Sequence, residues 1–139
     1  MKMKLIVASI ALAGVVGGLL WWSADLQKND PEILSSKGIH WHPELKIFVK
    51  GAPLEIPKDL GLGAVHNPMH THEDLPIIHL EFEGLVKKQD ITLGKFFTLW
   101  GKDMRSLGTT VRMMVNGVEN TEYESYIFKE GDRVELYYD

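Results

Sequence analysis

The residues from 5 to 22 contain no charged side chain, and this run of eighteen residues limits the possible folds more than any other feature. A helix needs roughly 20 apolar residues to cross a bilayer, so the run is close to a full span. Lys2 and Lys4 precede it, and the positive-inside rule places them on the cytoplasmic side. Residues 1–22 are therefore predicted to form one transmembrane anchor, with the rest of the chain on the extracytoplasmic side.

A cleaved signal peptide is the competing interpretation of the same residues. The best small-x-small motif, at 11–13, comes too early and would leave an apolar stretch behind it. Cleavage after Ala24 would put the bulky Trp22 where a small side chain is required. We therefore favour a retained anchor, with Trp21 and Trp22 at the membrane interface.

The remaining chain is predicted to consist of a polar linker, residues 23–37, and one domain, residues 38–139. The chain has 15 Lys and Arg against 19 Asp and Glu, and two of the lysines belong to the anchor. This acidic balance argues against nucleic acid and anionic lipid as partners. Because the chain has no cysteine, it has no disulfide, and a metal site would need nitrogen, oxygen or thioether ligands.

Hydrophobic patterns predict an α+β domain. Apolar and polar residues alternate over 45–49, and a turn at 51–53 leads to a second short strand through Leu54 and Ile56. A loop over 58–68 follows, and then a strand over 76–82.

The C-terminal half contains a short helix and further strands. The helix is expected over 93–100, with Thr92 or Asp90 as the N-terminal cap and Gly101 at its end. Asn116-Gly117 between valines predicts a hairpin, and a last strand passes through 134–138. The stretch "VNG…EYESYIFKEGDRVELYY" resembles the end of the ThiS/MoaD-like sulfur carriers, which implies a β-grasp-like mixed sheet with a histidine-bearing insertion. Those carriers end in Gly-Gly, whereas this chain ends in Tyr-Asp, so the resemblance does not extend to their chemistry.

The six histidines fall into two segments, "HWH" at 40–42 and "HNPMHTHEDLPIIHLEF" at 66–82. On an extended chain, a His-x-His pair places both imidazoles on one face. If Pro43 does not disturb the alternation, His40 and His42 point away from the core and Trp41 points into it. His79 and Glu81 likewise share the strand face opposite the apolar residues, and the loop before them supplies a second pair. We expect these segments to converge on one metal site formed by His40, His42, His70, His72, His79 and Glu81.

Other residues of the same region have open roles. His66 has no partner at a spacing of two, and a surface position is as good an explanation for it as a ligand role. Met69 is better explained as a loop anchor than as a thioether ligand. Glu73 and Asp74 could be ligands or loop surface. The whole cluster could also be fortuitous, or a patch of histidines that responds to pH.

The soluble part also resembles a set of uncharacterised, membrane-anchored archaeal and bacterial proteins. The similarity lies in "HWHPELKIFVKG", "MHTHEDLPIIHLEF" and "ITLGKFFTLWG". It implies that the six proposed ligand positions belong to a shared pattern, and it implies no mechanism.

Imidazole ligands without thiolate favour Cu(II), Zn(II), Ni(II) or Fe(II) over Ca(II) or Mg(II), with Cu(II) first and Zn(II) second. The absence of cysteine excludes a blue-copper centre. The favoured function is a metal chaperone, buffer or sensor rather than an enzyme. One alternative is a small metalloenzyme in which Glu81, Glu73 or Asp74 acts as a general base. Another is a metal-free interaction domain that docks on a membrane protein, and a homodimer that shares the histidine face is also compatible with the sequence.

Overall fold

The computed structural model describes residues 2–28 and 30–139. The chain separates into an N-terminal unit that ends at Ile33 and a second unit, Leu34–Asp139. The first unit contains α1 (Lys2–Lys28), in which Ile6–Leu26 is long and apolar enough to cross a membrane. At 1.5 Å per residue these 21 residues span roughly 31 Å, the thickness of a bilayer's hydrocarbon core. A signal sequence can have the same length and apolar composition, so these two properties do not distinguish it from a membrane-spanning helix.

The predicted linker, residues 23–37, is structured at both ends. α1 continues past the apolar run to Lys28, because the sequence there contains helix-compatible residues and no proline before Pro31. Further along, β1 (Ile33–Ser35) pairs with β7 (Val86–Lys87) in a two-stranded sheet. The polar composition of the segment did not reveal either element.

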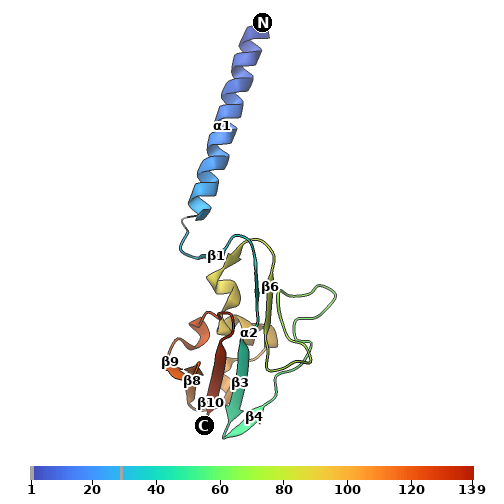
Figure 1. The fold of residues 1–139 in the computed structure, drawn as a ribbon, viewed down its shortest axis with the longest axis vertical. Helices are drawn as coiled ribbons and strands as arrows, with labels where there is room; N and C mark the ends of the chain where they lie inside the picture. Colours follow the sequence, from blue (N-terminus) through green and yellow to red (C-terminus); the bar gives the residue numbers. More distant parts are fainter. Residues whose placement is uncertain (1, 29) are drawn as a thin grey trace. The chain divides into compact units, whose positions relative to one another are not determined.

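The main sheet of the domain has five strands in the order β4-β3-β10-β8-β9 (Figure 1). β10 lies parallel to β3 and antiparallel to β8, and the other neighbours are antiparallel. The strands are β3 (Glu44–Val49), β4 (Ala52–Leu54), β8 (Val111–Val115), β9 (Val118–Asn120) and β10 (Arg133–Tyr138). The prediction of an α+β domain with a mixed sheet is confirmed.

Both hairpins of this sheet turn on a residue pair with positive φ. Asn116 and Gly117 have φ of 52° and 81°, as predicted for an Asn-Gly turn between β8 and β9. The first hairpin turns at Lys50 and Gly51, with φ of 50° and 80°. The prediction of a turn at 51–53 was therefore misplaced, since Ala52 and Pro53 belong to β4. Pro53 is tolerated there because β4 is an edge strand.

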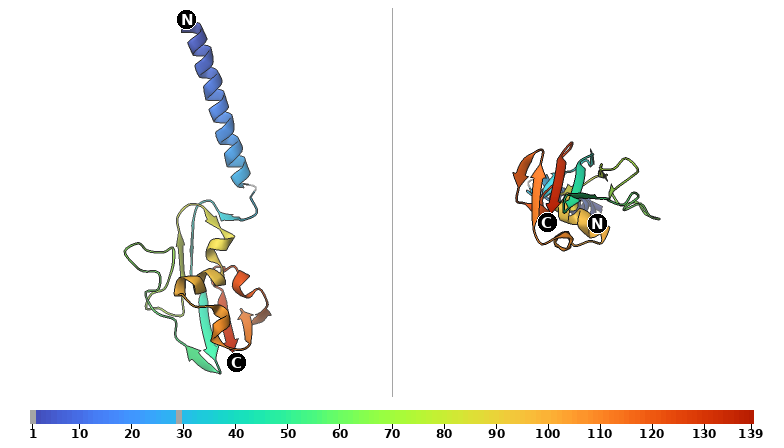
Figure 2. Two further views of the ribbon diagram at one scale, coloured as in Figure 1. Left: turned by 180° about the vertical axis from the view of Figure 1, so that it is seen from behind. Right: turned by 90° about the horizontal axis from the view of Figure 1, so that it is seen from below.

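The helix α2 (Leu93–Trp100) lies against one face of the five-stranded sheet, as the opposite views of Figures 1 and 2 show. Its predicted ends are confirmed: Thr92 Oγ1 accepts a hydrogen bond from Lys95 N, and Gly101 adopts a left-handed conformation with φ of 70°. Three 3-10 turns flank it or lie nearby: η1 (Lys88–Ile91), η2 (Met104–Leu107) and η3 (Tyr123–Ser125). A Cβ on Gly94 would lie 2.9 Å from the carbonyl oxygen of Glu124, so glycine allows α2 to approach η3.

The core lies between α2 and the sheet. It includes Leu45 and Ile47 of β3, whose polar neighbour Lys46 is exposed, and this confirms the predicted alternation. The same alternation on β10 buries Val134, Leu136 and Tyr138. The buried aromatic side chains of the core are those of Phe96, Phe97, Tyr126, Phe128 and Tyr138.

A separate three-stranded antiparallel sheet has the order β2-β6-β5. Its strands are β2 (Ile39–Trp41), β6 (His79–Phe82) and β5 (Met69–His70). The strand predicted over 76–82 is regular only from His79. Before that point Ile78 N donates to the carbonyl of Pro43, so this stretch follows the connection between β2 and β3.

Candidate metal centre

One face of the three-stranded sheet carries histidine and glutamate side chains from all three strands. His40 lies opposite Glu81 on the neighbouring strand, and His70 lies opposite His79. Residues directly opposite each other in an antiparallel pair project to the same face, and His79 and Glu81 are two positions apart. All four side chains therefore share one side of the sheet.

The other face of this sheet packs on the core. Leu80 lies opposite both Trp41 and Met69. Leu80 and Met69 are buried, and the half-buried Trp41 packs against the core. The predicted directions of His40 and Trp41 are thus correct. The argument from the alternation of β3 does not apply, because β2 ends before Pro43 and belongs to a different sheet.

Five imidazole rings form a continuous cluster, here called the histidine cluster. Its members are His40, His42, His70, His72 and His79. The ring centroids of His40 and His42 are 4.8 Å apart, and those of His42 and His79 are 5.1 Å apart. His79 is also 4.7 Å from His72 and 5.4 Å from His70. Segments nearly forty residues apart in the sequence therefore meet at His79.

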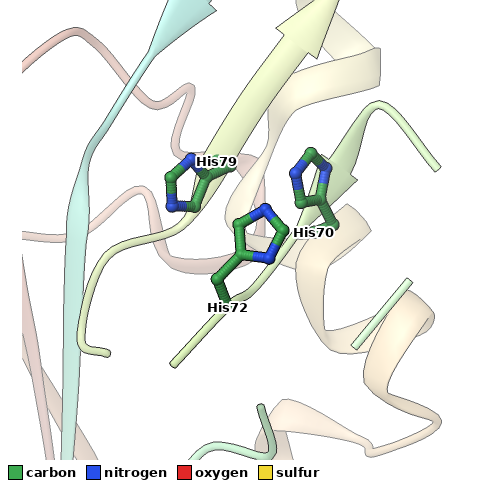
Figure 3. Close-up of side chains that lie close together, drawn as sticks. All are labelled: His70, His72 and His79. Atoms are coloured by element: carbon green, nitrogen blue, oxygen red, sulfur yellow. The ribbon is translucent and has the colours of Figure 1, made fainter. Parts of the chain in front are cut away.

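Within the described residues, 2–28 and 30–139, two groups of side chains could hold a metal ion. In each group, one donor atom per residue lies within 4.8 Å of the others. The inner group is His70, His72 and His79, whose rings are drawn together in Figure 3. The outer group is His40, His42 and Glu81. His70 is buried, whereas the side chain of His40 is 67% exposed.

Hydrogen bonds fix which nitrogen of two inner imidazoles can bind a metal. Nδ1 of His70 lies 3.0 Å from the carbonyl oxygen of Asn67, so this nitrogen carries the proton and Nε2 keeps its lone pair. Nε2 of His79 lies 3.1 Å from Oδ2 of Asp74 and donates to that carboxylate. Nδ1 of His79 then holds the free lone pair. It is buried without a hydrogen-bond partner, as a metal ligand would be in the metal-free protein.

The electrostatics of the inner group keep His70 in its metal-binding form. Burial lowers the pKa of His70, although its bond to Asn67 and the charge of Glu81 oppose this effect. The neutral imidazole, which is the form that binds metals, is therefore favoured. Burial would raise the pKa of Asp74, but the hydrogen bond and the charge interaction with His79, together with a backbone hydrogen bond and the charge of His72, outweigh this effect and hold the pKa below its usual value. Asp74 is therefore a carboxylate at neutral pH.

Glu130 contacts the outer group from a turn that is distant in the sequence. Its Oε2 accepts a 2.7 Å hydrogen bond from the backbone of His42, and its Oε1 lies 3.7 Å from Nδ1 of the same residue. The buried Asp132 shapes this turn by accepting hydrogen bonds from the Tyr126 hydroxyl, at 2.6 Å, and from Lys129 N, at 2.8 Å. The sequence analysis did not identify Glu130, because 88 residues separate it from His42 and no local pattern links them.

The other candidate residues have different surroundings. His66 is exposed on the wall of a pocket of about 760 Å³ that also includes His70 and His72, but it belongs to neither metal-binding group. Met69 is buried in the core, as expected of a loop anchor. Of the two acidic residues in the loop, Asp74 bonds to His79, whereas Glu73 pairs with Lys58 at 2.8 Å.

Comparison with protein-family models, with curated proteins and with solved structures gives no match to this chain.

Proposed function

We propose that the protein is a membrane-anchored, extracytoplasmic metal-binding protein that acts as a chaperone, buffer or sensor for Cu(II) or Zn(II). One observation carries the proposal. Nδ1 of His79 is buried among other histidines and has no hydrogen-bond partner, while its opposite nitrogen is held by Asp74. Metal-bound histidines commonly donate their second N–H to a carboxylate or a carbonyl in this way.

The donor chemistry supports the choice of metal. Five imidazoles and one carboxylate form the two groups, and the sequence supplies no thiolate. Nitrogen-rich sites suit Cu(II) and Zn(II), with Cu(II) highest in the general affinity order.

The placement of the carboxylates favours binding over catalysis. Asp74 and Glu130 already interact with ring nitrogens of His79 and His42. Glu81 lies between the two groups, with Oε1 at 3.6 Å from ring nitrogens of both His40 and His79. Each acidic group is thus placed to orient or ligate, which is the arrangement of a binding site.

The anchor and the scaffold complete the proposal. The apolar helix, Ile6–Leu26, would hold the domain at the membrane, and the two preceding lysines favour an extracytoplasmic domain. The element order of hairpin, histidine-bearing insertion, helix α2 and closing strands supports a β-grasp-like scaffold.

The proposal is tested by titrating the full-length chain in detergent micelles with Cu(II) and with Zn(II), followed by desalting and elemental analysis. We expect sub-micromolar binding and metal that stays with the protein through desalting. A chain that retains neither metal would contradict the proposal.

A further inference from the structure

The cluster contains two complete sets of donors rather than one. The inner and outer groups share no residue, and each offers three ligand atoms within 4.8 Å of one another. A tetrahedral ion takes four ligands, and one of these is often water. Six protein donors therefore exceed what a single Zn(II) ion uses.

Glu81 connects the two groups. Its Oε1 lies 3.6 Å from Nε2 of His40 in the outer group and 3.6 Å from Nδ1 of His79 in the inner group. Metal–ligand distances are about 2.0–2.2 Å, so an ion bound to either nitrogen would lie within reach of this carboxylate. In sites with two metal ions the separation is about 3.5–4 Å, a distance that one carboxylate can bridge.

The surrounding charge also fits two ions. Asp74 lies 3.1 Å from Nε2 of His79 on the inner side, and Glu130 lies 3.7 Å from Nδ1 of His42 on the outer side. With Glu81 between them, each divalent ion would have a carboxylate beside one of its histidine ligands, and the two ions would share Glu81. The carboxylates at the two ends of the cluster are thus placed to orient histidine ligands of two separate ions.

We infer that the histidine cluster binds two metal ions, one in each group, with the Glu81 carboxylate between them. This inference rests on the proposed metal-binding function. The inner ion binds first, because His70 is buried with one ring nitrogen already bonded and the side chain of His79 is only 12% exposed. His40 is largely exposed, so the outer group must lose more side-chain freedom when it binds a metal.

The test uses the full-length chain in detergent, saturated with Zn(II), desalted and measured for zinc per chain. The wild-type protein should retain two ions. His40→Ala removes one ligand from the outer group and His72→Ala removes one from the inner group, so each variant should retain one ion. His66→Ala is the matched control, because His66 lies on the same pocket wall outside both groups, and it should retain two.

Cu(II) provides an independent readout of the distance between the ions. Two Cu(II) ions this close couple magnetically, so the wild-type protein should show a half-field resonance by electron paramagnetic resonance, and His40→Ala should lose it. One zinc per wild-type chain, or two in His40→Ala, would overturn the two-ion inference and leave the proposed function intact. A wild-type chain that retains no metal would instead contradict the proposed function.

Discussion

His70 and His79 lie directly opposite each other on β5 and β6, and their rings stack with centroids 5.4 Å apart. Each ring has one nitrogen bonded to a protein oxygen, the Asn67 carbonyl for His70 and the Asp74 carboxylate for His79. Both imidazoles are therefore oriented before a metal arrives, which reduces the entropy cost of binding.

Asp74→Ala tests this orientation. Loss of the carboxylate frees the His79 ring and removes the negative charge that holds its second nitrogen, so metal affinity should fall by about 10–100-fold. Isothermal titration of the full-length chain measures the change. The neighbouring Glu73→Ala is the control, because Glu73 pairs with Lys58. Equal affinities for the two variants would show that Asp74 does not orient a ligand.

Trp41 should report metal binding at the outer group. It lies between His40 and His42 in the sequence, and bound Cu(II) quenches nearby indole fluorescence. We expect emission to fall on Cu(II) addition, with a smaller fall in Trp41→Phe, which retains Trp21, Trp22 and Trp100. Unchanged emission in the wild-type protein would argue against the pair at 40 and 42 as ligands.

Gly94→Ala should destabilise the domain, although alanine favours a helix over glycine by about 1 kcal/mol. The new Cβ would lie 2.9 Å from the Glu124 carbonyl oxygen and 3.1 Å from the Glu124 Cβ, so α2 and η3 would have to separate. Thermal unfolding followed by near-ultraviolet circular dichroism should show a lower midpoint. Lys95→Ala on the exposed side of α2 should change it little, and a Gly94→Ala midpoint at or above wild type would refute the packing explanation.

Glu124 should make stability depend on pH in the acid range. The hydrogen bond from Arg105, at 2.8 Å, lowers the pKa of Glu124 below its usual value of 4.5. Since the folded-state pKa is depressed, its contribution is present above pH 4.5 and is lost as the pH falls through the folded-state value. Both side chains are substantially exposed, so this contribution is small, under about 1 kcal/mol.

Denaturant titrations of Glu124→Gln and wild type should therefore differ at pH 7 and converge in acid. The exposed Glu119→Gln is the matched control and should follow wild type throughout. A difference between Glu124→Gln and wild type that stays constant with pH would assign the effect to packing rather than to charge.

Local signals in the sequence predict much of the fold. Three predicted features depend on only a few adjacent residues, and the structure has all of them: the helix N-cap at Thr92, the helix end at Gly101 and the Asn116-Gly117 turn. Alternation in β6 also gives the direction of His79 correctly, because one face of that strand must be buried.

Features that depend on distant contacts could not be predicted. β1 pairs with β7, which is distant in the sequence, and the two histidine segments belong to a small sheet of their own rather than to the sheet of β3. The sequence indicates one site of six ligands, whereas the structure arranges the same residues as two adjoining groups. The contacts of Asn67 and Glu130 with His70 and His42 follow from the folded loops, and no spacing rule reveals them.

The most direct test of metal binding by the histidine cluster is the Zn(II) affinity of His79→Ala, measured against a competing chelator with the full-length chain in detergent. His79 contacts three other rings of the cluster. Loss of a ligand should cost more than loss of its hydrogen-bond partner, so affinity should fall by at least about 100-fold, while His66→Ala binds as wild type does. Wild-type affinity in a folded His79→Ala would contradict the assignment of the cluster as the metal centre.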